Sequence, residues 1–291
     1  MWSSRVQSQF VVLLRGLLKM LVALFLLLPF LALVVGGLQH EGDLVDDVMR
    51  IWPTEVTFEN FEAVVRGVRV HPYIPTAVED IRGGFLNSVI VSVSVTALTL
   101  LFGSFSAYSL ARLKFRGYRR FSYAILFTRM VPITMLFIPL YLTLRALGLL
   151  NSNPGIIVCE IGFFLPYAIW ILFGFFQNLP SDLEDAARVD GCTRIQAFFR
   201  IVIPLSTPGL AACAVIVFLI SWNELIIPLV LTSKPAAATL PVVLGYFATE
   251  TVFPQVIIYA AGVYCALPTI ALAILLHRHM VQGLTAGAVK G

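Results

Sequence analysis

Charged residues are scarce in this chain, and their scarcity excludes most classes of soluble protein. Only 12% of the 291 residues are Asp, Glu, Lys or Arg, about half the usual share of a soluble domain, whereas 59% are hydrophobic. Mean hydropathy is +0.90. A soluble core of this size could not bury so much apolar surface. The composition therefore excludes a soluble enzyme, a disordered protein and a nucleic-acid-binding protein, and it predicts a polytopic protein of the lipid bilayer.

The residue patterns that build metal and catalytic sites are missing as well. The 4 cysteines form no C-x-x-C pair, and most lie in apolar stretches, so we interpret them as small buried hydrophobic residues. No G-x-x-x-x-G-K-[ST] loop is present with which the chain could cradle a nucleotide itself. Nor does the sequence suggest a nucleophile beside a base. We expect no metal, no cofactor and no catalytic residue in this chain.

Six charge-poor runs are long enough to cross a bilayer as helices, because about 20 apolar residues span the hydrocarbon core. They lie between Lys19 and His40, between Arg82 and Arg112, from about Ser122 to Leu144, from about Asn153 to Phe176, from about Ser206 to Leu231, and between Gln255 and His277. The first run exceeds the length of a signal-peptide core, so we expect it to be retained as an anchor. The fold class predicted is all-α, with six transmembrane helices.

Orientation follows from the basic residues in the connections. Most of the 20 Lys and Arg residues lie in the segment before the first run, in the loops after the second and fourth runs, and in the tail. Because cytoplasmic loops are enriched in Lys and Arg, we predict that both termini are cytoplasmic. The parts expected are a cytoplasmic segment at 1–19, a membrane helix at 20–39, an acidic outside loop of short helices and turns at 40–82, a five-helix core at 83–278 and a cytoplasmic tail at 279–291.

The loop between the fourth and fifth runs is predicted to fold as two short helices joined by a glycine turn. Ser181 with Glu184, and Thr193 with Gln196, have the spacing of capping boxes at helix starts. Gly191 suits the left-handed residue that ends a helix. One apolar face is expected on the second helix, from the i, i+3, i+4, i+7 spacing of Ile195, Phe198, Phe199 and Val202. Such a loop could lie on lipid or dock on another protein.

The same loop resembles the E-A-A-x(3)-G-x(9)-I-x-L-P motif of permease subunits in bacterial ATP-binding-cassette importers. Asp185 takes the glutamate position, and Ile203 replaces the leucine. The matching residues are Ala186, Ala187, Gly191, Ile201 and Pro204. Asp190 beside Gly191, the Trp222-Asn223-Glu224 triplet and the glycine-rich ending after Gly283 are similar to those of MalG-type carbohydrate permeases. The resemblance extends from about residue 20 to the end of the chain.

The resemblance implies the MetI-like fold of a type I importer permease in a bacterial inner membrane. It implies that loop 180–204 is a coupling loop that docks on a cytoplasmic ATPase subunit. The residues expected to take part are Glu184, Asp185, Ala186, Ala187, Asp190, Gly191, Phe198, Ile201 and Pro204. The partners implied are a second, MalF-like permease, two copies of an ATP-binding subunit that hold ATP and Mg, and an extracytoplasmic sugar-binding protein. The tail after His279 is also expected to meet the ATPases.

The function expected is to form half of the translocation path for a sugar, a di- or oligosaccharide. A permease of the same kind for a polyamine or an organophosphate is the first alternative. A secondary transporter, which needs no ATPase, is the second, but the sequence shows neither the internal repeats nor the discontinuous helices typical of that class.

Four polar residues within the apolar runs are candidates for the translocation path. Arg129, Glu160 and Glu224 are costly in a membrane, and Asn223 stands beside Glu224. Such groups either face a cavity or make hydrogen bonds that specify how helices pack. The sequence leaves both readings open.

The apolar segment at 232–254 cannot be one membrane helix, because prolines stand at positions 235, 241 and 254. An apolar segment that does not span must bury itself against protein. It is predicted either to cap the helices of its own subunit or, as the resemblance implies, to enter the cleft of the docked binding protein through Tyr246 and Phe247.

Overall fold

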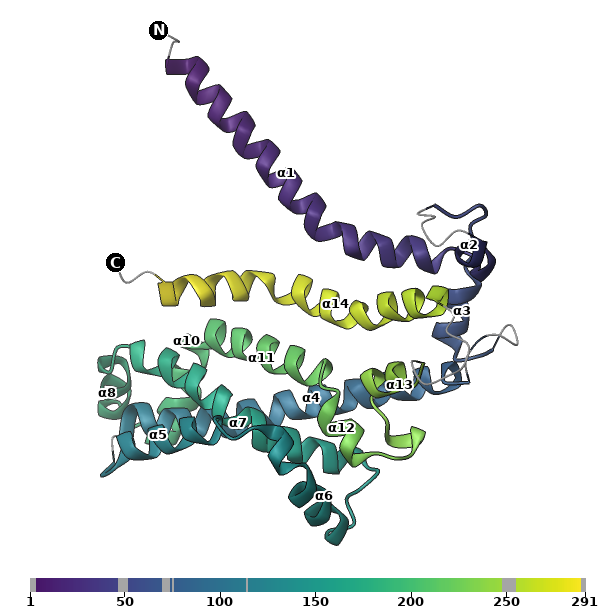
Figure 1. Cartoon of the computed structure of the whole chain (residues 1–291). Helices are drawn as coiled ribbons and strands as arrows, with labels where there is room; N and C mark the ends of the chain where they lie inside the picture. Colours follow the sequence, from purple (N-terminus) through teal and green to yellow (C-terminus); the bar gives the residue numbers. More distant parts are fainter. Residues whose placement is uncertain are drawn as a thin grey trace. The chain divides into compact units, whose positions relative to one another are not determined.

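A computed structural model describes residues 4–46, 52–69, 74, 76–113, 115–247 and 255–288. Every regular element in these ranges is a helix, as the sequence predicts (Figure 1). The chain divides into two compact units. One comprises Met1–Arg82 with Tyr246–Leu267, and the other comprises Gly83–Gly245 with Pro268–Gly291.

The first unit is built on a long, exposed apolar helix. Its elements are α1 (Ser4–Gly37), α2 (Glu41–Asp46), α3 (Glu59–Arg66) and the beginning of α14 (Gln255–Ala288). Asn60 of α3 donates hydrogen bonds to the carbonyls of Gly37, at 3.0 Å, and Gln39, at 2.8 Å, which ties the first loop to the end of α1. A Cβ atom on Gly36 would overlap the ring of Tyr259, so glycine permits α14 to approach α1 there.

The second unit holds the remaining helices. They are the body of α4 (Val78–Tyr108), η1 (Ser109–Leu113), α5 (Tyr118–Thr128), η2 (Ile133–Leu136), α6 (Phe137–Ala146), α7 (Asn153–Asn178), α8 (Asp182–Val189), α9 (Arg194–Ala197), η3 (Phe198–Val202), α10 (Ile203–Leu205), α11 (Thr207–Trp222), α12 (Ile226–Leu231), η4 (Pro235–Ala237), most of α13 (Leu240–Phe247) and the end of α14. Apolar side chains of α7 pack against α4 and α11 and form the main core of this unit. Gly103 faces Ala168, and Gly209 faces the ring of Phe175, so both neighbours approach α7 closely.

Within the part of the chain that the structure describes, four helices are long and apolar enough to cross a membrane unbroken: Val11–Gly37, Val78–Leu113, Asn153–Asn178 and Gln255–Leu276. Two bent pairs bring the possible total to six. Tyr118–Thr128 meets Ile133–Ala146 at 86°, and Arg194–Leu205 meets Thr207–Trp222 at 76°. The third predicted run, 122–144, is therefore not a continuous helix, and the fifth, 206–231, is interrupted between the end of α11 at Trp222 and the start of α12 at Ile226. Pro132 explains the first break, since proline cannot donate the helical hydrogen bond.

Candidate functional site

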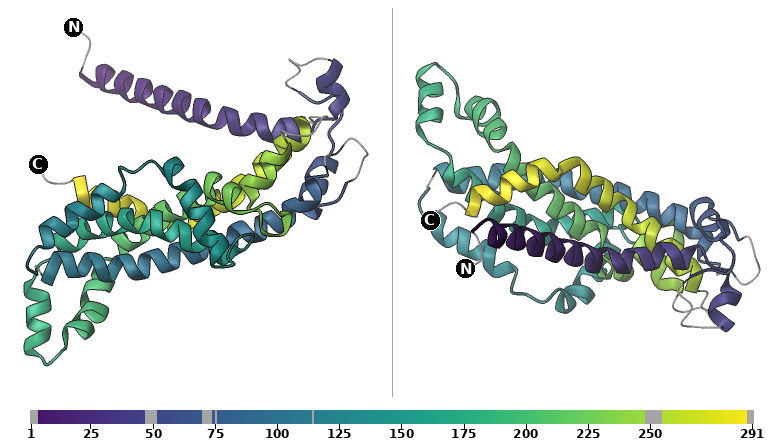
Figure 2. Two further views of the ribbon diagram at one scale, coloured as in Figure 1. Left: turned by 60° about the horizontal axis from the view of Figure 1, so that its bottom comes forward. Right: turned by 90° about the horizontal axis from the view of Figure 1, so that it is seen from above.

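The coupling loop folds in outline as the sequence predicts. In both views of Figure 2 it projects from the ends of α7 and α11 as a helical hairpin. Gly191 follows α8 with a left-handed φ of 90°. The second capping box is confirmed, because Thr193 Oγ1 accepts from the Gln196 amide at 3.3 Å and the Thr193 amide donates to Gln196 Oε1 at 2.8 Å.

The prediction of the first capping box, Ser181 with Glu184, is wrong. The Ser181 side chain caps no amide, and Glu184 does not reach back to it. Glu184 is buried instead, where Oε2 accepts a hydrogen bond from the Tyr108 hydroxyl at 2.9 Å. Its Oε1 lies 2.7 Å from Arg112 Nε in an ion pair whose N–H is not aligned as a hydrogen bond. The attraction of a buried guanidinium outweighs that of an exposed helix end.

The predicted apolar face of the second helix is split between core and surface. Phe198 and Val202 are buried, whereas Ile195 and Phe199 are 67% and 52% exposed. The cause is the π-helical turn η3, whose wider turn shifts the face away from 3.6-residue spacing. The Phe198 ring lies 4.8 Å from the Tyr108 ring, centroid to centroid.

The expected ATPase contacts divide in the same way. Glu184, Ala187 and Phe198 are buried, and their role in coupling stays a prediction. Ile201 is half-buried. The exposed members are Asp185, Ala186, Asp190, Gly191 and Pro204.

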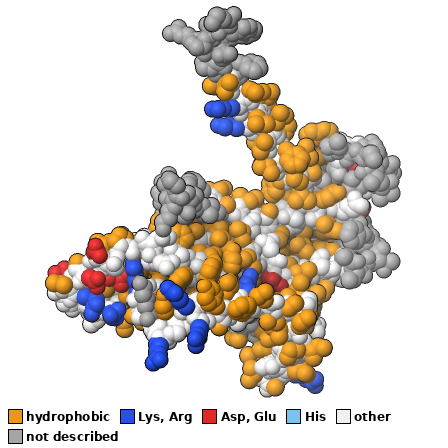
Figure 3. Space-filling view, turned by 60° about the vertical axis from the view of Figure 1, so that its left-hand side comes forward, with side chains coloured by type: hydrophobic (Ala, Val, Ile, Leu, Met, Phe, Trp, Pro, Cys, Tyr) orange, Lys and Arg blue, Asp and Glu red, His pale blue; other side chains and the backbone are white. Residues whose placement is uncertain are grey.

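Figure 3 shows acidic and basic side chains gathered toward one end of the face in view, with hydrophobic side chains over most of the rest.

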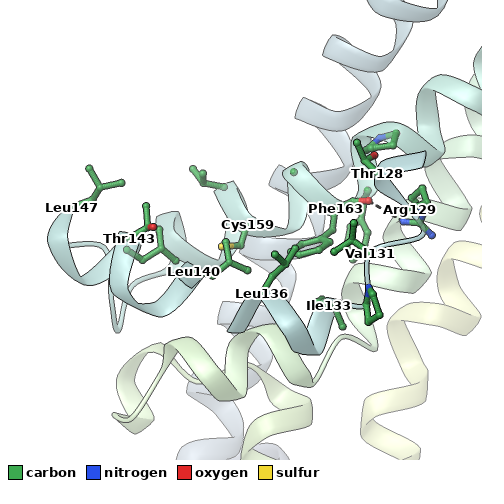
Figure 4. A pocket seen from close by; sticks show the side chains of 16 residues that line it. Thr128, Arg129, Val131, Ile133, Leu136, Leu140, Thr143, Leu147, Cys159 and Phe163 are labelled. Carbon is green, nitrogen blue, oxygen red and sulfur yellow. Dashed lines mark hydrogen bonds between the residues drawn. The ribbon is translucent and has the colours of Figure 1, made fainter. Parts of the chain in front are cut away.

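A cavity of about 630 Å³ lies between the bent pair α5–η2–α6 and α7 (Figure 4). Its lining is mostly apolar, and Arg129 is the charged residue in it. Arg129 stands at the break after α5, where its Nη1 donates to the Phe163 carbonyl at 2.9 Å. Its guanidinium carbon is 5.3 Å from the centre of the Tyr167 ring, within reach of a cation–π interaction. The cavity has the volume of a small-molecule site.

The other path candidates do not line this cavity. Glu160 is 0% exposed, and its Oε2 accepts a hydrogen bond from the Ser221 hydroxyl. Glu224 Oε1 accepts from the amides of Ile226 and Ile227 at 3.0 and 3.1 Å, so it caps α12. The Asn223 amide donates to the Leu219 carbonyl at 2.7 Å and closes the end of α11. The four candidates therefore do not form one site. The buried hydrogen bond of Glu160 favours the packing alternative, whereas Asn223 and Glu224 bond at helix ends and keep exposed surface.

Residues 232–247, here called the proline segment, fold back as η4 and α13. Phe247 and most apolar side chains of the segment are buried, whereas Tyr246 is half-buried. Burial on this scale favours the cap over the chain's own helices, and it argues against Phe247 as an exposed contact. Residues 248–254 lie outside the described residues.

Asn87 of α4 holds the proline segment, a role that the sequence analysis missed. Its Nδ2 donates to the carbonyls of Ala236, at 3.0 Å, and Ala238, at 2.9 Å, while its Oδ1 accepts from Asn153 Nδ2 at 2.9 Å. The adjacent Ser88 Oγ accepts from the Leu240 amide at 2.8 Å. A polar Asn-Ser pair in an apolar helix was the available signal.

Replacing Asn87 with alanine is expected to loosen the proline segment. The change removes these hydrogen bonds and leaves two carbonyls without their donor, which costs about 1–3 kcal/mol. Hydrogen exchange at the amides of residues 236–240 should become faster. Asn178→Ala is the control, because that exposed side chain donates to the Gly174 carbonyl of its own helix, away from the proline segment. Equal exchange in both variants would contradict the holding role.

The segment expected as a cytoplasmic tail, 279–291, begins within α14. Helix α14 continues to Ala288, without a break after His279. The side chains beyond Leu276 lie outside the described part, so the expected ATPase contact of this region stays a prediction.

Comparison with known proteins gives a consistent set of matches. The family model described as "Binding-protein-dependent transport system inner membrane component" matches residues 99–286. The trehalose transport system permease protein SugB of Mycobacterium tuberculosis is 36% identical over 278 residues, which cover 95% of this chain and 97% of the relative. The diacetylchitobiose uptake system permease protein DasC of Streptomyces coelicolor is 33% identical, covering 91% of this chain and 92% of that protein. A solved bacterial importer of the acidic polysaccharide alginate contains a chain with a similar fold, with a TM-score of 0.75 at 22% identity, over 96% of this chain and 99% of that chain.

Proposed function

The chain belongs to the family of binding-protein-dependent transport system inner membrane components, and on this premise we propose that it forms half of the path by which a di- or oligosaccharide enters a bacterial cell. It is a multi-pass permease subunit, the non-catalytic membrane part of an ATP-driven importer, and the family carries no cofactor of its own. The observation that carries the sugar proposal is the similarity, over more than nine-tenths of the chain, to permeases named for trehalose and diacetylchitobiose.

The proposed assembly contains a second permease, two ATP-binding subunits and an extracytoplasmic sugar-binding protein. Family membership supports these partners, and the distribution of basic residues supports cytoplasmic termini. We place the coupling loop against an ATPase subunit, with its exposed apolar side chains as the contact. These are Leu183, Val189, Ile195 and Phe199. Exposed apolar groups on a projecting loop are typical of a docking surface.

Within the permease, the cavity beside Arg129 is the segment of path that we favour. Its apolar wall suits the faces of sugar rings, and the Arg129 guanidinium can donate to sugar hydroxyls. Asn223 and Glu224 are the further path candidates, since neither is fully buried.

The function is tested by reconstituting the complete complex in proteoliposomes with a panel of loaded binding proteins. Binding proteins that carry di- or oligosaccharides should stimulate ATP hydrolysis and uptake. Stimulation by polyamine- or organophosphate-loaded proteins instead would replace the sugar with an alternative solute. Uptake that follows an ion gradient without ATP hydrolysis would favour a secondary transporter.

The coupling role is tested by Gly191→Val. A β-branched side chain disfavours the left-handed φ of 90° by about 1–2 kcal/mol, so the turn between α8 and α9 should be displaced. We expect uptake and ATPase binding to fall while membrane insertion persists. Gly148→Val is the matched control, because Gly148 is also left-handed, at φ 69°, with open space around it, but lies outside the coupling loop. Normal ATPase binding and uptake in Gly191→Val would refute the role.

A further inference from the structure

We propose that Glu184 is a positioning residue that fastens α8 to the end of α4, so that α4 carries a displacement of the coupling loop to the proline segment. The proposal rests on the proposed function, in which an ATPase subunit displaces α8. It concerns what the displacement moves inside the permease.

The fastening is a buried group of three residues, here called the latch: Tyr108 and Arg112 at the end of α4–η1, and Glu184 in α8. The Arg112 and Glu184 side chains are only 13% and 11% exposed. Arg112 also donates from Nη2 to the Leu179 carbonyl at 2.7 Å. One guanidinium therefore holds both the carboxylate of α8 and the chain that enters α8.

The chain segments on either side of α8 fix its position less firmly than the latch does. Leu179, which follows α7, has an extended backbone with ψ 139°, so the helix of α7 does not continue into α8. On the other side, the left-handed turn at Gly191 separates α8 from α9. With a non-helical link at each end, α8 owes much of its fixed position to side-chain contacts. Removing one partner of an ion pair this buried is strongly destabilising.

The far end of α4 carries the second fixed contact. Asn87 and Ser88 hold the proline segment by the hydrogen bonds described above. The helical rise places the two ends of this rod about 30 Å apart. Between them, Gly103 lets α4 pack closely against Ala168 of α7. A rigid helix with a specific contact at each end is the kind of contiguous element that can transmit a displacement.

The experiment uses the whole importer in proteoliposomes, with Glu184→Gln and Arg112→Gln as test variants. Arg116→Gln is the matched control, because it removes one positive charge at an exposed position of the same loop. A swapped pair, Glu184→Arg with Arg112→Glu, tests rescue. ATP hydrolysis and sugar uptake are measured together. In a parallel series Lys234→Cys, at an exposed position of the proline segment, is labelled from outside with an impermeant maleimide, with and without trapped ATP. The parent chain, with its own 4 cysteines, gives the background.

We expect the test variants to keep ATP hydrolysis while uptake per ATP falls about tenfold, within the usual range of coupling energies. The difference in labelling of Lys234→Cys between the two states should disappear, and the swapped pair should restore part of both readouts. Arg116→Gln should behave like the parent. Unchanged uptake per ATP, or a parallel loss of hydrolysis and uptake that the swapped pair does not restore, would overturn the proposal. Failure of the unaltered chain to bind an ATPase would instead overturn the proposed function.

Discussion

Gly155→Ala is expected to destabilise the permease by about 3 kcal/mol, the upper part of the range for an overpacked site. A Cβ atom at Gly155 would overlap the Leu149 carbonyl oxygen, which is backbone and cannot turn aside. That carbonyl is already fixed, because it accepts from the Ser152 hydroxyl at 2.7 Å. The same hydroxyl accepts from the Gly155 amide at 3.3 Å and caps α7. The methyl group would therefore open the cap.

The destabilisation by Gly155→Ala should extend to the proline segment as well. Asn151, in the same turn, accepts at Oδ1 from the amides of Ser233 and Lys234, at 2.7 and 3.1 Å. The midpoint of thermal unfolding in detergent measures the effect. Gly162→Ala is the control in the same helix, since its Cβ would meet open space and alanine favours a helix by about 1 kcal/mol. Equal unfolding midpoints for the two variants would show that the turn before α7 accommodates the methyl group without loss of stability.

The coupling loop shows what a local pattern can and cannot predict. The turn at Gly191 and the capping box of Thr193 were predicted because each depends on residues within a few positions. The partner of Glu184 was not predicted, because Arg112 is far away in sequence and belongs to another helix. Helix-end patterns assign a carboxylate to the nearest amide, whereas a buried guanidinium attracts it more strongly.

The membrane segments show a similar division. Composition predicted six spans, and the helices account for up to six. It did not predict the bend after Thr128 or the interruption between α11 and α12. Pro132 was visible at the bend, but proline is common in membrane helices and does not by itself indicate a sharp bend. Polar residues were correctly identified as unusual. Assigning each polar residue to a cavity or to helix packing requires knowledge of which side of its helix faces a neighbour.

Glu160 provides the sharpest test of that assignment. Ser221→Ala removes the hydroxyl that donates to Glu160 Oε2, and Oε1 has no other partner among the described residues. Leaving the buried Glu160 carboxyl group without this hydrogen-bond partner costs about 1–3 kcal/mol, so the unfolding midpoint should fall. Ser109→Ala is the control, because its exposed hydroxyl donates to the Phe105 carbonyl one turn away, and removing it should cost little.

The double variant Ser221→Ala with Glu160→Leu separates packing from transport. Replacing both polar partners with apolar groups of similar volume is often neutral, so we expect stability to return close to that of the parent. Because Glu160 has no solvent exposure, uptake should return with it. A double variant that is stable but does not transport would place Glu160 in the translocation path, and one that remains unstable would show that α7 and α11 need the polar contact to pack.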